Sequence, residues 1–143
     1  TSVAGRTELF IDNREGNCDV MLDVGHNPHA GRFLAKTLAQ LKQKNNYRRV
    51  IGVVAMLADK DIKNTLYPLQ GVIDEWNLAQ LTVPRAASVE LMTKELASPT
   101  NSINCFDNIS QAFKIANKKA ESTDLILVFG SFFTVAEVRR LLV

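Results

Sequence analysis

The chain has 143 residues, enough for one domain with a sizeable hydrophobic core. Hydrophobic residues make up 46% and charged residues 22%, which excludes a largely disordered chain. The net charge of +2 argues against nucleic acid as a partner, and no apolar run approaches the length of a membrane span. Cys18 and Cys105 lack CxxC spacing and no signal peptide is visible, so we expect a reduced, cytoplasmic setting.

The first half of the chain predicts three strands and two helices. Strands are expected at residues 7–12, 18–24 and 49–56, the second buried on both faces because its alternation is weak. Asn27 is a good N-cap and Pro28 a good first helical residue, so they begin a helix that Asn45-Asn46 ends. Its apolar face is expected to hold Phe33, Leu34, Leu38 and Leu41. A shorter helix follows Asp61, and Pro68 kinks or ends it.

The second half continues the alternation of strands and helices. Strands are expected within residues 75–83, 103–106 and 124–129. Ser88 caps a helix after the first of these strands, and Asp107 or Asn108 opens a helix after the second. After the third strand, Thr134 and Glu137 are expected to form a capping box for the last helix. No strand or helix signal precedes Gly5.

This alternation predicts an α/β domain, built as a three-layer, mostly parallel open sheet of about six strands with helices on both faces. In open sheets of this kind, ligands bind outside the carboxyl ends of the strands. Five polar residues follow predicted strand ends: Asp23, His26, Lys60, Arg85 and Ser131. Scattered surface polarity would not require this coincidence, so we expect a functional cleft at that edge of the sheet.

Residues 23–30 (DVGHNPHA) join a strand end to a helix N-terminus, whose free N–H groups and dipole attract anions. A metal site on Asp23, His26 and His29 is disfavoured, since His29 would lie inside the helix and face away from His26. A hydrolase triad of Ser131, His26 and Asp23 is disfavoured because the G-x-S-x-G pattern is missing. Neither G-x-x-x-x-G-K-[ST] nor G-x-G-x-x-G occurs, so we expect any nucleotide site on this chain to be partial.

Four stretches in order carry a family resemblance: residues 23–30, 56–62 (MLADKDI), 84–88 (PRAAS) and 130–135 (GSFFTV). They resemble D-V-A-H-N-P-H-A, M-L-x-D-K-D-I, P-R-x-A-[ST] and G-S-F-H-T-V of the bacterial folylpolyglutamate synthase/dihydrofolate synthase family, within the Mur ligase superfamily. Gly5-Arg6 is similar to the G-R that opens the C-terminal domain of that family. The resemblance spans nearly the whole chain and covers only that C-terminal domain.

The resemblance implies a Rossmann-like C-terminal domain of an ATP-dependent, ADP-forming amide ligase. In such enzymes a carboxylate of dihydropteroate or folate is phosphorylated to an acyl phosphate, which the amine of L-glutamate then attacks. The cofactors are ATP and Mg²⁺, and the P-loop, the magnesium ligands and most of the pterin site belong to an N-terminal domain. Residues 1–143 would then be a single C-terminal domain of a longer enzyme, inactive alone, with that N-terminal domain as its partner.

The resemblance also implies roles for individual residues. Arg6 and Asp23 match positions that bind ATP, Asp23 through the ribose hydroxyls. His26 and Lys60 match catalytic positions, and the residues implied for glutamate binding are Asn27, Lys60, Arg85 and Ser131. Two positions depart from the family pattern: Gly25 replaces an alanine, which loosens the loop, and Phe133 replaces a common histidine.

Two alternatives to the folate enzyme remain open. One is the C-terminal domain of a Mur ligase of peptidoglycan synthesis, which fits the D-K-D-I and G-S-F stretches less well. The other is a stand-alone nucleotide-binding module without catalysis, which an upstream P-loop would exclude. Within the folate enzymes, the chain is compatible with dihydrofolate synthesis, polyglutamate extension or both.

Overall fold

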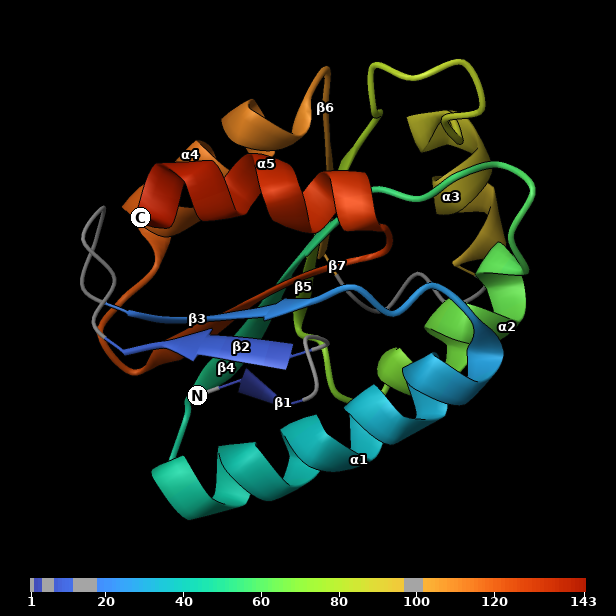
Figure 1. The fold of residues 1–143 in the computed structure, drawn as a ribbon. Coiled ribbons are helices and arrows are strands. Elements are labelled where there is room, and N and C mark those ends of the chain that lie inside the picture. The colour runs from blue at the N-terminus through green and yellow to red at the C-terminus, as the bar shows by residue number, and fades with distance from the viewer. Residues whose placement is uncertain (1, 4–6, 12–17, 97–101) are drawn as a thin grey trace.

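The computed structural model describes residues 2–3, 7–11, 18–96 and 102–143 (Figure 1). These residues form a seven-stranded sheet in the order β1-β2-β3-β7-β4-β5-β6. The strands from β3 to β6 in that order are parallel, and β1 and β2 add an antiparallel edge. The strands are β1 (Ser2–Val3), β2 (Thr7–Phe10), β3 (Asp19–Asp23), β4 (Arg49–Val54), β5 (Glu75–Ala79), β6 (Ser102–Phe106) and β7 (Asp124–Phe129). The helices are α1 (Pro28–Asn45), α2 (Ile62–Leu66), the short 3₁₀ helix η1 (Tyr67–Leu69), α3 (Val89–Glu95), α4 (Ile109–Lys119) and α5 (Phe132–Leu142).

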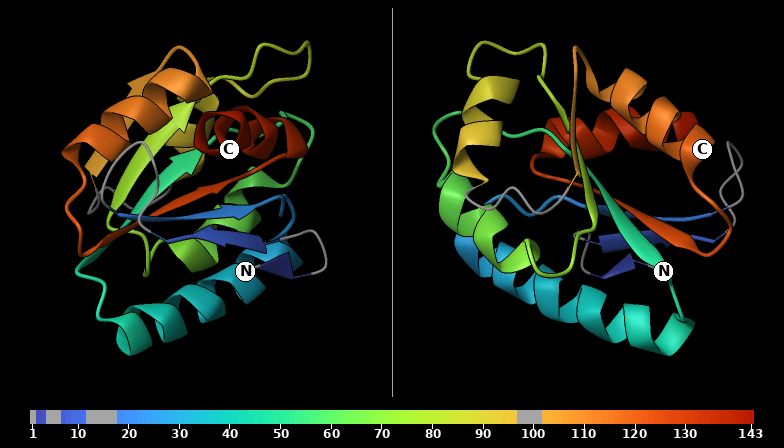
Figure 2. Two further views of the ribbon diagram at one scale, coloured as in Figure 1. Left: turned by 60° about the vertical axis from the view of Figure 1, so that its left-hand side comes forward. Right: turned by 180° about the vertical axis from the view of Figure 1, so that it is seen from behind.

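Helices cover both faces of the sheet (Figure 2). On one face lie α1, α2, η1 and α3, whose Leu34, Leu66 and Met92 belong to one buried apolar cluster. On the other face lie α4 and α5, whose Phe113 and Val138 belong to a second cluster. Between them β7 is buried along its whole length. The predicted three-layer α/β sheet with helices on both faces is therefore confirmed, and β1 is a short strand beyond the six expected.

The carboxyl ends of three central strands are level with one another. Asp23, the last residue of β3, pairs with Phe129, the last residue of β7. Phe129 also pairs with Val54, the last residue of β4. The loops after β3 and β7 then lead to helices on opposite faces, α1 and α5. Such a reversal of direction is where open α/β sheets bind ligands.

Polar side chains cap the helices largely as the sequence predicts. Asn27, Ser88 and Asn108 each accept a hydrogen bond from the backbone N–H three residues further on. Asn46 ends α1 in the left-handed conformation, with φ of 57°. On α1, however, only part of the predicted apolar face is buried. Leu34 and Leu38 are covered, whereas Phe33 is 58% exposed and does not belong to that face.

The predicted capping box at the last helix is wrong. α5 begins at Phe132, and Ser131 is its N-cap, with Oγ accepting from the Thr134 N–H at 3.0 Å. Thr134 is buried in the first turn and donates to the carbonyl oxygen of Ala55 at 2.7 Å. Glu137 instead accepts a hydrogen bond from Ser110 and pairs with Arg140. The pattern misled because Ser131, three residues earlier, makes the same kind of cap.

Candidate functional site

Asp23 places a buried carboxylate, 6% exposed, at the carboxyl end of β3. Thr7, directly opposite on β2, donates its hydroxyl hydrogen to Oδ2 at 2.6 Å. The backbone N–H of Gly25 donates to Oδ1 at 2.7 Å. A carboxylate has about four acceptor positions, so these two bonds orient it and leave it able to accept others. The group is therefore suited to binding two neighbouring hydroxyls.

The start of α1 lies beside this carboxylate. His26 is half-buried, with Nδ1 3.1 Å from the carbonyl oxygen of Val24. With the proton on Nδ1 this contact is a hydrogen bond, and Nε2 is then an acceptor. Asn27 is exposed, and its Oδ1 accepts from the Ala30 N–H at 2.8 Å. Its oxygen therefore serves as the helix cap, and its NH₂ group is what it can offer to a ligand.

These groups line a hollow of about 100 Å³. The loop after β3 contributes Asp23, His26 and Asn27, while β2 contributes Thr7 and α1 contributes Phe33; Val24, Gly25 and Ala30 complete the lining. A hydroxyl-accepting carboxylate thus lies next to a helix N-terminus that favours negative charge. A sugar phosphate carries both hydroxyl groups and negative charge, so this arrangement fits part of a nucleotide.

Lys60 lies in the loop after β4 and Arg85 in the segment after β5. Backbone hydrogen bonds join these two segments. The Ala58 N–H donates to the carbonyl oxygen of Arg85 at 2.7 Å, and the Ala87 N–H donates to that of Met56 at 2.9 Å. Arg85 also forms an exposed ion pair with Asp59, Nη1 to Oδ2, at 2.7 Å.

Lys60 is half-buried in the first of these loops. Its ammonium group makes no ion pair with any residue in the ranges that the structure describes. Arg85, by contrast, is already partly neutralised by Asp59. Of these two cations, Lys60 is therefore the one whose charge is better able to pair with a ligand carboxylate.

Ser131 follows β7 and is buried. Its Oγ accepts from the Thr134 N–H and lies 2.9 Å from the Thr134 hydroxyl. Gly130 before it has φ of +123°, and a Cβ there would lie 2.4 Å from the carbonyl oxygen of Ala55. The turn is thus held against the loop after β4, and the Ser131 hydroxyl is engaged within it. This buried cap does not have the exposure of a hydrolase nucleophile.

Two further residues were considered in the sequence analysis, Arg6 for ATP and His29 for a metal site that was disfavoured. Arg6 is outside the described residues. His29 is the second residue of α1 and is exposed. Within the described ranges, no group of three or more His, Cys, Asp or Glu side chains could hold a metal ion. Among the helices described, none has the length and apolar character needed to cross a membrane.

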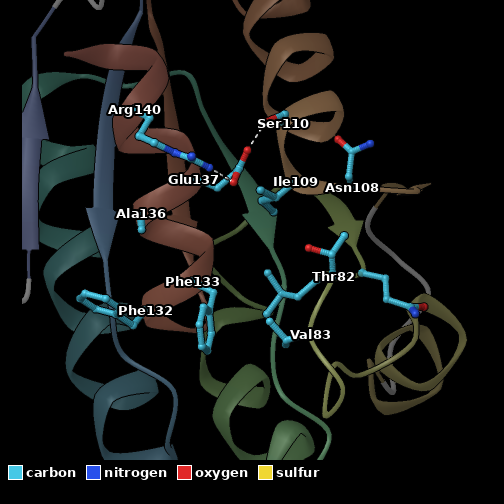
Figure 3. A pocket seen from close by; sticks show the side chains of 12 residues that line it. Thr82, Val83, Asn108, Ile109, Ser110, Phe132, Phe133, Ala136, Glu137 and Arg140 are labelled. Carbon is cyan, nitrogen blue, oxygen red and sulfur yellow. Dashed lines mark hydrogen bonds and ion pairs between the residues drawn. The ribbon is translucent and has the colours of Figure 1, made fainter.

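A second, larger cavity of about 280 Å³ lies between the segment after β5 and helices α4 and α5 (Figure 3). Figure 3 shows Glu137 on α5 turned toward Ser110 on α4, whose hydroxyl donates to it at 2.9 Å. Phe132, Phe133 and Ile109 contribute apolar surface. Among the residues that the structure describes, none of those predicted for ATP or glutamate lines this cavity. The smaller hollow, by contrast, is lined by the predicted site residues Asp23, His26 and Asn27.

Sequence reasoning missed two residues of the hollow, Thr7 and Phe33. The contact of Thr7 with Asp23 depends on the register of β2 against β3, which the sequence does not reveal. The sequence does hold a signal for Phe33. Leu34, Leu38 and Leu41 already follow the spacing of one helix face, so Phe33 could have been assigned to the exposed side of the helix.

Comparisons with known proteins show the family of the chain. The chain matches the family described as Mur ligase, glutamate ligase domain, over residues 5–132. It is 39% identical over 123 residues to the dihydrofolate synthase/folylpolyglutamate synthase of Escherichia coli (strain K12), in an alignment covering 86% of this chain and 28% of that protein. The chain therefore spans little more than a quarter of the length of this curated relative.

Solved structures of the same kind of enzyme share the fold. One is a bifunctional folylpolyglutamate synthase/dihydrofolate synthase with Mn, AMPPNP and L-glutamate bound, with a TM-score of 0.83 and 38% identity over 99% of this chain and 32% of that one. Another is E. coli FolC in complex with DHPP and ADP, with a TM-score of 0.78 and 39% identity over 86% of this chain and 28% of that one.

Proposed function

Since the chain belongs to the Mur ligase glutamate ligase domain family, we propose that it is the C-terminal domain of an ATP-dependent, ADP-forming amide ligase. The whole enzyme would join L-glutamate to dihydropteroate or folate through an acyl phosphate, in the cytoplasm. Its N-terminal domain would supply the P-loop and the ligands of the divalent cation. The relatives support this proposal, because the structures similar to this domain include complexes with AMPPNP, ADP and L-glutamate.

The oriented carboxylate of Asp23 is the observation that carries the proposal. Hydrogen bonds to an ionised acceptor are about twice as strong as neutral ones, so two ribose hydroxyls would bind Asp23 well. The Thr7 and Gly25 bonds fix the carboxylate before the nucleotide arrives. The start of α1 beside it would favour the phosphates of the same nucleotide. Arg6 is proposed as a further ATP contact on the sequence pattern alone.

The proposed glutamate site would draw on the loops after β3, β4, β5 and β7. Lys60 would neutralise a carboxylate of glutamate, whose amine attacks the acyl carbon and displaces inorganic phosphate. His26, with Nε2 as acceptor, would take a proton that this amine loses. Arg85 and Ser131 already have partners in the domain, so they would contribute less to glutamate binding than Lys60. Asn27 would contribute its NH₂ group.

Steady-state kinetics of the full-length enzyme test this division of roles. Asp23→Asn is expected to raise the KM for ATP, and Lys60→Ala the KM for glutamate. Each variant loses a charge-assisted contact of about 1.5–3 kcal/mol, which corresponds to roughly 10- to 150-fold. Lys63→Ala, which removes an exposed lysine on α2, is the matched control and should change neither constant. If Lys60→Ala raised only the KM for ATP, the proposed glutamate contact would be wrong.

A further inference from the structure

Phe33 is an aromatic side chain that the hydrophobic core does not use. It lies on the second turn of α1 and is 58% exposed, while Leu34 and Leu38 of the same helix are buried against the sheet. Phe33 nevertheless lines the hollow that contains the Asp23 carboxylate. A large apolar ring beside a charged group, with more than half its surface open, is available to a ligand.

The size of the hollow limits which part of a nucleotide can enter it. Pockets that enclose a whole drug-sized ligand measure about 300–1,000 Å³. The hollow measures about 100 Å³, so it holds only one part of such a ligand. Its carboxylate suits the ribose hydroxyls, and the base must then lie over the rim. Phe33 supplies the phenyl ring among the residues that line the hollow.

We propose that Phe33 is the platform on which the base of the bound nucleotide stacks, while the hollow receives the ribose. The inference rests on the proposed function and adds the part of the site that binds the base. A phenyl ring offers a π-face but no hydrogen-bonding group, so it contacts the flat face of the base without reading its edge. Phe33 therefore contributes affinity for purine nucleotides without selecting adenine over guanine.

Calorimetric titration of the full-length enzyme can separate the base contact from the sugar contact. The two ligands are ATP and ribose 5-triphosphate, which is the same molecule without its base, titrated without glutamate or the folate substrate so that no turnover occurs. Phe33→Ala is expected to weaken the binding of ATP about 5- to 20-fold, at the low end of what loss of a base–aromatic stack produces. The same variant should bind ribose 5-triphosphate as the parent enzyme does. Phe33→Trp, which keeps an aromatic face, should retain most of the ATP affinity.

Tyr67→Ala is the matched control, because Tyr67 is a similarly exposed aromatic residue, at 68%, that does not line the hollow. It should leave the binding of both ligands unchanged. If Phe33→Ala weakened both ligands equally, or weakened neither, the stacking proposal would be overturned. The ratio of GTP to ATP affinity should also be the same in Phe33→Ala as in the parent, and a changed ratio would show that Phe33 selects the base.

Asp23→Asn distinguishes failure of the inference from failure of the proposed function. This variant should weaken ATP and ribose 5-triphosphate alike, since both carry the ribose hydroxyls. If it weakened neither, the proposed ribose contact would be wrong, whatever Phe33→Ala does. If it weakened both while Phe33→Ala changed nothing, the proposed function would stand and the base platform alone would be rejected.

Discussion

A hydroxyl from the neighbouring strand is one of the two donors that orient the Asp23 carboxylate. Thr7 donates to Asp23 Oδ2 at 2.6 Å, and the two residues lie opposite each other in the sheet. Thr7→Val keeps the shape of the side chain and removes the donor. We expect the Kd of the full-length enzyme for ATP to rise about 3- to 10-fold, because a hydrogen bond to a charged group is lost. Thr7→Ser keeps the hydroxyl and should bind ATP as the parent does, whereas unchanged binding by Thr7→Val would show that Asp23 needs no such support.

Asn27 illustrates why sequence patterns overstate the roles of polar residues in a site. Its position at a strand end and helix start was correctly predicted, and its side chain was assigned to glutamate. In the structure its Oδ1 caps α1, as does the Ser131 hydroxyl at α5. Asn and Ser are common at helix starts for this structural reason alone. A sequence can therefore place such residues at the functional edge without telling which atoms are free for a ligand.

Two substitutions separate the cap from a ligand contact at Asn27. Asn27→Ser keeps a capping oxygen but removes the NH₂ group, whereas Asn27→Ala removes both. Loss of the cap should lower the free energy of unfolding by about 1 kcal/mol in Asn27→Ala and by much less in Asn27→Ser. Denaturant unfolding measures this difference. If Asn27 contacts glutamate, the KM for glutamate should rise in both variants. A KM that stays at the parent value in Asn27→Ser would limit Asn27 to capping.

At the scale of whole elements, the turn between β7 and α5 is held against the residues that follow β4. Gly130 has φ of +123°, and a Cβ there would lie 2.4 Å from the Ala55 carbonyl oxygen. Gly130→Ala should therefore lower the free energy of unfolding by about 2–4 kcal/mol, through backbone strain and a forced shift of the turn. Gly71→Ala is the control, since a Cβ there meets nothing within 4 Å, and it should change stability by less than about 0.5 kcal/mol. Equal stability of the two variants in denaturant unfolding would contradict this account of the turn.

The elements themselves were well predicted, because each is marked by its own residues. Apolar runs identified the six strands from β2 to β7, and Asn27 and Ser88 identified the starts of α1 and α3. The errors occurred where the sequence offers two local solutions. Ser131 and Thr134 can each cap a helix, and only the packing of Thr134 against Ala55 decides between them. Phe33 and Leu34 are both apolar and adjacent on α1, and only Leu34, which shares the helical spacing of Leu38, faces the sheet.

At the scale of the whole molecule, parallel strands bring distant segments to one edge. The level ends of β3, β7 and β4 place the loops of Asp23, Ser131 and Lys60 next to one another in the sheet order. Sequence reasoning predicted this gathering, because it follows from the α/β pattern alone. It did not predict the antiparallel pairing that brings Thr7 to Asp23, since pairing register is a tertiary property.

The 143-residue chain alone is expected to fold, to bind ATP weakly and to form no ADP. It contains neither glycine-rich phosphate-binding pattern, and phosphoryl transfer depends mainly on such loops and on positioned cations. Two charge-assisted bonds of about 1.5–3 kcal/mol each, set against at least about 4 kcal/mol for association, leave about 2 kcal/mol at most, which corresponds to a Kd of tens of millimolar or weaker. Calorimetric titration with ATP and an assay of glutamate-dependent ADP release measure both quantities, with a buffer blank and the full-length enzyme as controls. Micromolar binding of ATP, or ADP release above the blank, would show that this domain holds a complete nucleotide site and would contradict the division of the active site between two domains.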